Sequence, residues 1–232
     1  MKIALRTPDW AVIDDFLSPS QWRAALGYID RESFRFVHES GWFRTYRLED
    51  GNPLEGPTHL SRALSPAQAA SAMPTGKGID ALIARLDEVL DEFADIVGHR
   101  DRDWILFTAR AFLYPRGTAL SWHNDRDPEL PRSGAFAYYV HEHWKHGWGG
   151  ELLLAPPEGS RDLGRFVMPT PNRLVLIRAG VEHAIQPVLP AAGDAVRASI
   201  AGFMIGLGAS KPAVPDADEA DEADNASGRP RA

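Results

Sequence analysis

The pattern of apolar residues changes at Trp104, and this change divides the chain into a helical part and a β part. After Trp104, short segments rich in apolar, β-branched and aromatic residues alternate with glycine and proline, which is typical of strands. The predicted strands are residues 105–113, 135–140, 152–155, 173–177 and 197–204. Two helices followed by a run of strands predict an α+β domain whose sheet part is a sandwich or a barrel.

Two helices are predicted before that point. A short strand within residues 10–17 leads to Ser18, which can cap a helix with Pro19 in its first turn. Gln21 completes a capping box with Ser18. Over residues 79–97, apolar side chains recur at helical spacing and charged side chains occupy the other side. We expect this apolar stripe to be core.

Two other stretches lack such a pattern. Residues 49–74 hold four prolines and two glycines, so we expect a long loop that forms part of the substrate wall. Residues 209–232 hold six acidic and three basic side chains, a net charge of −3 out of the chain's −7. This composition predicts a disordered acidic tail. The expected organisation is one domain over residues 1–208, with a catalytic core at about 104–206.

Composition excludes several classes of site. The 232 residues include no cysteine, so a disulfide framework, an iron–sulfur cluster and a thiol nucleophile are ruled out. Any metal must be held by histidine and carboxylate. The net charge of −7 argues against a broad nucleic-acid-binding surface. Since there is neither a long apolar run nor a secretory signal, we expect a cytoplasmic protein with no membrane association.

One set of side chains has the spacing of a metal site. His123 and Asp125 stand two apart at the end of a predicted strand, where alternation places both on one face. His183 follows another predicted strand. Two histidines and a carboxylate form the facial triad that holds non-haem iron and leaves positions open for cosubstrate and oxygen. Taken alone, His-x-Asp fits a surface turn at a strand end equally well.

Two other groupings compete on spacing. Asp127 offers an alternative carboxylate but breaks the two-residue register from His123. His141, His143 and His146 lie close together and could be read as a second metal site. Because tryptophans stand beside them, these histidines are better candidates for the rim of a pocket than for ligands.

Seven short motifs follow one another between residues 109 and 204. They are Tyr114-Pro115-x-Gly117, His123-x-Asp125, Tyr138-Tyr139, Gly149-Gly150-Glu151-Leu152, Pro171-x-Arg173-Leu174-Val175-Leu176, Gly180-x-x-His183 and Arg197-x-Ser199. In this order and spacing they resemble the catalytic core of the 2-oxoglutarate- and Fe(II)-dependent oxygenases, in the prolyl-4-hydroxylase-like branch. The segment 12–18 resembles the entry to the same fold. The resemblance implies a double-stranded β-helix (jelly-roll or cupin-like) with N-terminal supporting helices.

The resemblance also implies roles for particular residues. His123, Asp125 and His183 would bind Fe(II) and so make up the catalytic centre. Arg197 would grip the far carboxylate of 2-oxoglutarate through two parallel hydrogen bonds. Tyr139 matches the position whose phenol binds the same carboxylate.

Three further groups complete the expected site. Ser199 would assist Arg197, and Tyr114 matches a tyrosine that lines the pocket near the metal. The candidates for the substrate pocket are Trp122, His143, Trp144 and Trp148, with ordinary packing as the alternative for the tryptophans.

The implied activity is hydroxylation of an unactivated C–H bond in an amino acid or a peptidyl residue, proline being the commonest target of the branch. Oxygen would be consumed, succinate and CO2 released, and ascorbate would support turnover. Related halogenases have a small residue in place of the carboxylate ligand, so Asp125 favours hydroxylation. The alternatives are natural-product tailoring, nucleic-acid demethylation, which the acidic balance disfavours, and a non-enzymatic barrel that binds metal or 2-oxoglutarate.

Overall fold

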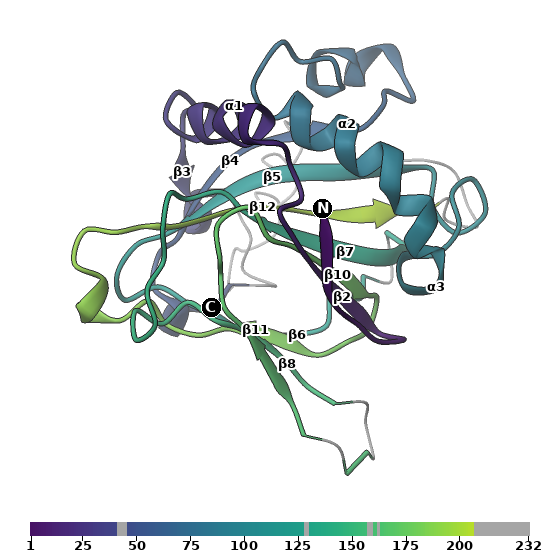
Figure 1. Cartoon of the computed structure of the whole chain (residues 1–232). Coiled ribbons are helices and arrows are strands. Elements are labelled where there is room, and N and C mark those ends of the chain that lie inside the picture. The colour runs from purple at the N-terminus through teal and green to yellow at the C-terminus, as the bar shows by residue number, and fades with distance from the viewer. Residues whose placement is uncertain (41–45, 128–129, 157–159, 162, 207–232) are drawn as a thin grey trace, which may run out of the picture.

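The computed structural model describes residues 1–40, 46–127, 130–156, 160–161 and 163–206. Its strands form one large and one small sheet (Figure 1). The acidic tail expected at residues 209–232 lies outside the described residues, as does the boundary at residue 208.

The large sheet has eight antiparallel strands in the order β1-β2-β10-β7-β12-β5-β4-β3. Their bounds are Lys2–Arg6 (β1), Trp10–Asp14 (β2), Arg35–Phe36 (β3), Leu54–Leu60 (β4), Leu106–Tyr114 (β5), Arg132–Tyr139 (β7), Leu174–Arg178 (β10) and Arg197–Ile205 (β12). The central strands are almost wholly buried, which explains why their sequences read as continuous apolar segments.

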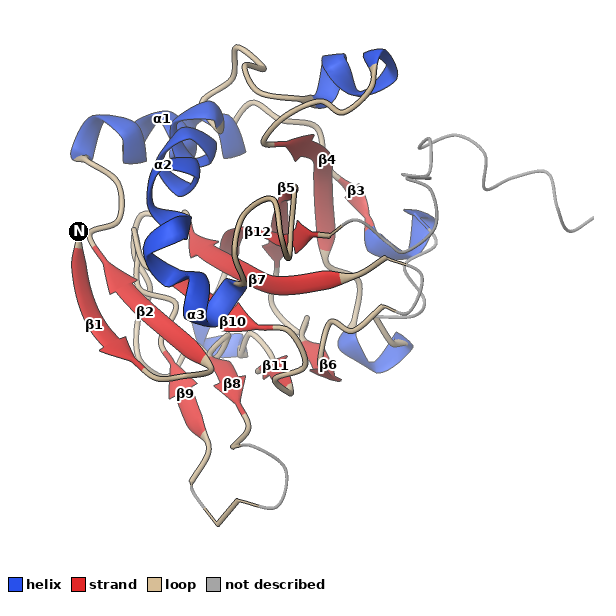
Figure 2. Cartoon of the chain, turned by 90° about the vertical axis from the view of Figure 1, so that its right-hand side faces the viewer, coloured by secondary structure: helices blue, strands red, loops and turns tan. Residues whose placement is uncertain are grey.

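The small sheet has the order β6-β11-β8-β9. Its strands are Leu120–His123 (β6), Leu152–Leu154 (β8), Arg165–Val167 (β9) and His183–Ile185 (β11). Strands β8 and β9 project from the body as a hairpin (Figures 1 and 2). The inner faces of the two sheets meet in a buried cluster that includes Val12 and Val175 from the large sheet and Leu152 and Val167 from the small one. This confirms the predicted α+β class with a double-stranded β-helix core.

The helices cover the outer face of the large sheet (Figure 1). Helix α1 spans Pro19–Ile29 and begins with the predicted capping box between Ser18 and Gln21. The periodic stretch 79–97 forms α2 (Asp80–Val89), a 3-10 turn (Leu90–Phe93) and α3 (Ala94–Val97). Its apolar residues are buried against the sheet, as expected for a core stripe.

The long loop expected over residues 49–74 is a wrong prediction, because this stretch contains the seven-residue strand β4. Strand β4 pairs with β5, and the pairing shifts register between Glu55 and Thr58. Pro57 lies in that irregularity, where a strand tolerates a residue without a backbone N–H. The prolines therefore hid a strand that tertiary pairing stabilises. Two short 3-10 turns, Leu48–Asp50 and Pro66–Ser71, flank it.

The sequence also does not predict strands β1, β3 and β9, because each is short and lies at the edge of a sheet.

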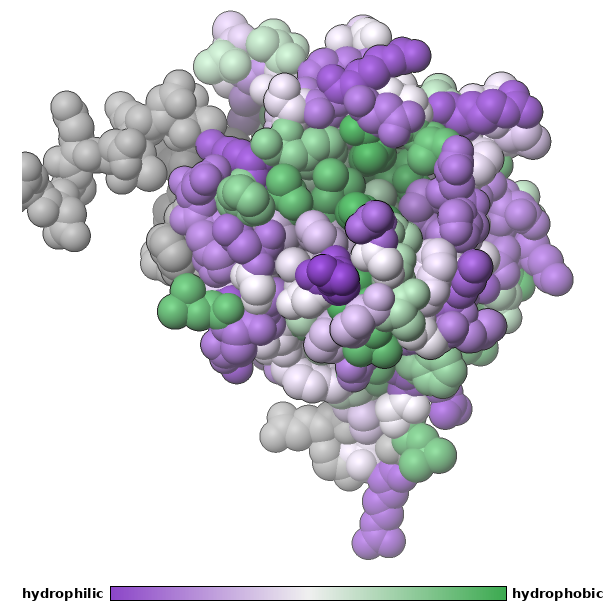
Figure 3. Space-filling view, turned by 90° about the vertical axis from the view of Figure 1, so that its left-hand side faces the viewer, coloured by the Kyte–Doolittle hydropathy of each residue, from purple (hydrophilic) through white to green (hydrophobic). Residues whose placement is uncertain are grey.

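On the face shown in Figure 3, hydrophobic residues gather in a band between hydrophilic side chains above and below. Such exposed apolar bands are common places for contact with substrates or partners. Within the described ranges, no helix is long and apolar enough to cross a membrane.

Candidate metal and cosubstrate site

The small sheet places two histidines side by side. Strands β6 and β11 pair antiparallel with His123 directly opposite His183. Their ring centroids lie 4.2 Å apart. Residues 60 positions apart in the chain thus come together through strand pairing, which the sequence pattern does not encode directly.

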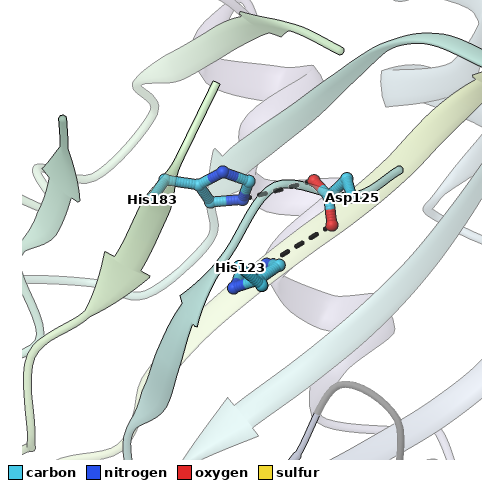
Figure 4. Close-up of side chains that lie close together, drawn as sticks. All are labelled: His123, Asp125 and His183. Carbon is cyan, nitrogen blue, oxygen red and sulfur yellow. Dashed lines mark ion pairs between the residues drawn. The ribbon is translucent and has the colours of Figure 1, made fainter. Parts of the chain in front are cut away.

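Asp125 reaches the same point from a turn rather than from the strand face. Strand β6 ends at His123, and Asp125 has a left-handed backbone with φ of 59°. Aspartate tolerates this conformation better than most residues do. Its Oδ1 lies 3.3 Å from His123 Nε2 and its Oδ2 lies 3.2 Å from His183 Nε2 (Figure 4). The expected proximity is present, but strand alternation does not explain it.

The outer nitrogen of each imidazole is held by the backbone. His123 Nδ1 lies 2.8 Å from the Ser121 carbonyl oxygen, and His183 Nδ1 lies 2.9 Å from that of Val181. A carbonyl oxygen only accepts, so both Nδ1 atoms carry the proton. Each Nε2 is then the nitrogen that faces the centre and that a metal ion would bind.

The three inner donors form a compact set. One atom from each of His123, Asp125 and His183 lies within 4.8 Å of the other two. Burial raises the pKa of Asp125, but its contacts with the two imidazoles outweigh burial and hold that pKa well below its usual range. Two imidazole nitrogens and one carboxylate therefore converge, a donor set that fits a divalent transition metal such as iron.

Arg197 supplies a buried positive charge nearby. It begins β12, stands opposite Tyr114 on β5 and is only 1% exposed. Its Nε donates to the Gly150 carbonyl oxygen at 2.7 Å and its Nη1 donates to Ser199 Oγ at 3.3 Å. Among the residues that the structure describes, no carboxylate forms an ion pair with it. A buried cation without an anion is costly, so this pocket fits an anionic ligand.

Two tyrosines enclose the guanidinium. Its Cζ lies 5.0 Å from the ring centroid of Tyr114 and 5.0 Å from that of Tyr139. The Tyr139 hydroxyl is buried, and within the described ranges no hydrogen bond of normal geometry reaches it. Burial raises the pKa of Tyr139, and the charge of Arg197 opposes that rise. Arg197 and Tyr139 together offer buried hydrogen-bond donors of the kind that a carboxylate accepts.

Tyr114 has a partner that the sequence analysis did not identify. The hydroxyl oxygens of Tyr46 and Tyr114 lie 2.7 Å apart, and both rings are buried. Burial raises the pKa of Tyr114 to about 12, although Arg197 and the Tyr46 contact lower it. Tyr114 is therefore a neutral phenol at neutral pH. No motif marks Tyr46, since only the fold brings it to this pocket.

The four candidates for the substrate pocket differ in exposure and in the direction they face. Trp122 is 48% exposed and, by strand alternation, faces away from the side of β6 that carries His123. His143 is exposed. Trp144 and Trp148 are half-buried and pack edge to face at 5.2 Å. Trp144 also donates from Nε1 to the Gly149 carbonyl oxygen at 2.8 Å, so it supports the turn that contacts Arg197.

His141 is not a rim residue, which corrects the expectation for that histidine. It is 6% exposed, with Nδ1 3.1 Å from the Ala198 carbonyl oxygen and Nε2 2.6 Å from that of Pro169. Its neighbours His143 and His146 are exposed, as a rim position requires. Sequence spacing could not separate the three, because the burial of His141 depends on contacts with β12 and with the segment at Pro169.

One protein-family model matches the part of the chain that carries these side chains. The model of the 2OG-Fe(II) oxygenase superfamily matches residues 109–205, which hold all three metal-site candidates and Arg197. This part of the chain therefore resembles the 2-oxoglutarate- and Fe(II)-dependent oxygenases. A search of curated proteins finds no match.

Three solved structures have a similar fold. A Pseudomonas putida prolyl-4-hydroxylase is 19% identical with a TM-score of 0.58, over 86% of this chain and 94% of that one. A Trichoplax adhaerens prolyl hydroxylase, solved with a hypoxia inducible factor peptide fragment, is 18% identical with a TM-score of 0.58, over 86% and 84%. A Burkholderia pseudomallei 2OG-Fe(II) oxygenase family protein is 11% identical with a TM-score of 0.58, over 84% of each chain. The fold is therefore prolyl-hydroxylase-like.

Proposed function

We propose that this protein hydroxylates an unactivated C–H bond of an amino acid or a peptidyl residue, with proline as the first substrate to test. The observation that carries the proposal is the convergence of His123, Asp125 and His183. Tyr114 interacts with both Asp125 and the buried Arg197, for which the described residues supply no carboxylate partner. The overall reaction is R–H + O2 + 2-oxoglutarate → R–OH + succinate + CO2. The similarity to prolyl hydroxylases supports proline as the starting point.

Each side chain has a defined task in this proposal. Nε2 of each imidazole and the carboxylate of Asp125 would bind Fe(II). These three protein ligands would leave coordination positions open for cosubstrate and oxygen. The metal would supply the oxygen chemistry when bound, coupled to decarboxylation of 2-oxoglutarate. The presence of Asp125 favours hydroxylation over halogenation, since the carboxylate fills the position that a halide would need.

The cosubstrate would lie between the metal site and Arg197. Arg197 and the Tyr139 hydroxyl would bind its far carboxylate, with Ser199 holding one guanidinium nitrogen in place. Because the guanidinium is buried and already fixed by Gly150 and Ser199, little side-chain entropy would be lost on binding. Tyr114 would line the wall on the other side of Arg197.

A coupled assay tests the proposal. The purified chain, supplied with Fe(II), ascorbate and 2-oxoglutarate, is incubated with free proline, proline-rich peptides and a panel of other amino acids. We expect one of these to raise succinate formation and to gain one oxygen atom by mass spectrometry. Ascorbate should prolong turnover without being consumed in proportion to product. The variant His123→Ala should form no succinate above background.

Two results would contradict the proposal. Wild-type protein that binds neither Fe(II) nor 2-oxoglutarate in calorimetry would exclude the cofactor assignment. Binding of both without any substrate-stimulated succinate, across amino acids and peptides, would instead exclude hydroxylation of this substrate class.

A further inference from the structure

We propose that Asp50 is a positioning residue for the metal site, acting on His123 through Ser121. The inference rests on the proposed assignment of His123 as a ligand. Asp50 closes the 3-10 turn Leu48–Asp50, in the stretch whose sequence suggested only a loop. It lies 73 positions before His123 in the chain, so the contact depends entirely on the tertiary fold.

The Asp50 carboxylate is buried and fully engaged. Its residue is 2% exposed. Oδ1 accepts a hydrogen bond from Ser121 Oγ at 2.6 Å, and Oδ2 accepts one from the Arg47 backbone N–H at 2.9 Å. The Asp50 carbonyl oxygen also accepts from the Ala119 N–H at 2.8 Å. Asp50 therefore fixes both the entrance of β6 and the side chain of Ser121.

Ser121 passes this constraint to the ligand. The carbonyl oxygen of Ser121 accepts the Nδ1 proton of His123 at 2.8 Å, which sets both the tautomer and the ring orientation. The corresponding carbonyl for His183 belongs to Val181, whose side chain has no hydroxyl to be held in this way. On the His123 side, a buried carboxylate is therefore hydrogen-bonded to the residue whose carbonyl oxygen holds the ligand.

The turn that carries Asp50 is pressed closely against the chain before β6. Gly51 has φ of +72°, and a Cβ there would lie 3.0 Å from the Gly117 carbonyl oxygen. The backbone can approach this closely only because glycine stands at position 51. Strand β6 is consequently anchored at three successive points: near Gly117, at Ala119 and at Ser121.

Asp50 differs from Glu55, another buried carboxylate, in the groups that it binds. Glu55 is 1% exposed and pairs with both Arg35 and Arg110. In the part of the chain that the structure describes, no cation pairs with Asp50, and its bonds are to Ser121 and to backbone. A buried carboxylate without a cation costs stability, and the hydrogen bonds of Asp50 to Ser121 and to backbone offset that cost.

The test measures metal binding on four variants of the full chain. Asp50→Ala removes the carboxylate, Asp50→Asn keeps an oxygen acceptor, and Ser121→Ala removes the hydroxyl. Glu55→Gln is the control for loss of a buried carboxylate away from the ligands. Co(II) is titrated by calorimetry without cosubstrate, and its ligand-field spectrum reports the geometry. Circular dichroism and melting of the metal-free proteins check that each is folded.

We expect Asp50→Ala and Ser121→Ala each to weaken Co(II) binding about 10-fold and to alter the ligand-field spectrum. Asp50→Asn should retain most of the affinity, and Glu55→Gln all of it. Wild-type affinity in a folded Asp50→Ala protein would overturn the inference. An equal loss of Co(II) affinity in Glu55→Gln would also overturn it. So would a result in which Asp50→Asn loses as much affinity as Asp50→Ala while Ser121→Ala keeps the wild-type value. Failure of the wild type to bind Co(II) would instead refute the proposed metal site. If Asp50→Ala does not fold, Ser121→Ala and Asp50→Asn decide.

Discussion

His123 and His183 stand directly opposite each other on β6 and β11, with ring centroids 4.2 Å apart. Each ring donates Nδ1–H to a carbonyl oxygen two residues earlier in its own chain segment. The pair thus forms a preorganised half of the proposed metal site, to which the segment after β6 adds Asp125.

Asp125→Ala should greatly weaken metal binding, whereas Asp127→Asn should leave it near wild type. Asp125 contacts both imidazoles, while Asp127 lies 3.3 Å from Arg132 Nη2 in an ion pair. Loss of a direct ligand should lower Co(II) affinity by at least about 100-fold, more than loss of a residue behind a ligand. Calorimetric titration of both variants checks this. An equal loss in both would show that the carboxylate ligand had been assigned to the wrong residue.

Arg197→Gln should weaken 2-oxoglutarate binding by about 10- to 100-fold, equivalent to about 1.5–3 kcal/mol for a charge-assisted hydrogen bond. Tyr139→Phe should have a smaller effect, because it removes a neutral donor. Metal affinity without 2-oxoglutarate should stay near wild type in both, since neither side chain belongs to the donor set. Titration of 2-oxoglutarate into the metal-loaded protein gives the result. Unchanged affinity in Arg197→Gln would place the cosubstrate elsewhere.

Gly150→Ala should damage the anion pocket. The added Cβ would lie 2.8 Å from Arg197 Cδ, and Gly150 has φ of +73°. Gly147→Ala is the matched control, because Gly147 also has positive φ (+83°) but has no atom within 4 Å of an added Cβ. Both should lose about 1 kcal/mol of unfolding free energy from backbone strain. Only Gly150→Ala should also weaken 2-oxoglutarate binding; the same loss in Gly147→Ala would contradict the close approach as its cause.

His141 should make the protein less stable as the pH falls below about 6.5. Burial lowers the pKa of His141 to about 4, and the charge of Arg197 acts in the same direction, although the Pro169 and Ala198 carbonyls oppose it. The unfolded state therefore binds a proton between pH 6.5 and 4 that the folded state excludes. The contribution of neutral His141 to the free energy of unfolding is therefore complete above pH 6.5. It decreases by about 1.4 kcal/mol per pH unit as the pH falls from 6.5 to 4.

Urea unfolding of wild type and His141→Gln at pH 7.5 and pH 5 measures that contribution. All other titrating groups are common to both proteins, so the difference between them isolates His141. We expect the wild type to lose about 2 kcal/mol more than the variant between the two pH values. His146→Gln, at an exposed position, should behave like wild type. An identical pH dependence in wild type and His141→Gln would show that His141 does not titrate in this window.

The sequence by itself determined the class of the fold and the chemistry of the donor set. Helical periodicity over residues 79–97 and the apolar strands after Trp104 are local patterns, and burial of apolar side chains acts on them wherever the chain folds. The absence of cysteine left histidine and carboxylate as the metal ligands, and the motif order selected His123, Asp125, His183 and Arg197.

Only the tertiary structure decided what surrounds these groups. Strand β4 forms despite its prolines because β5 offers a partner, and that pairing is not visible in local sequence. Asp125 reaches its position through a left-handed turn, His141 is buried while its neighbours are exposed, and Asp50 contacts Ser121 across a separation of 71 residues. Each of these depends on contacts between distant segments, whose energies do not exist until the sheets have assembled.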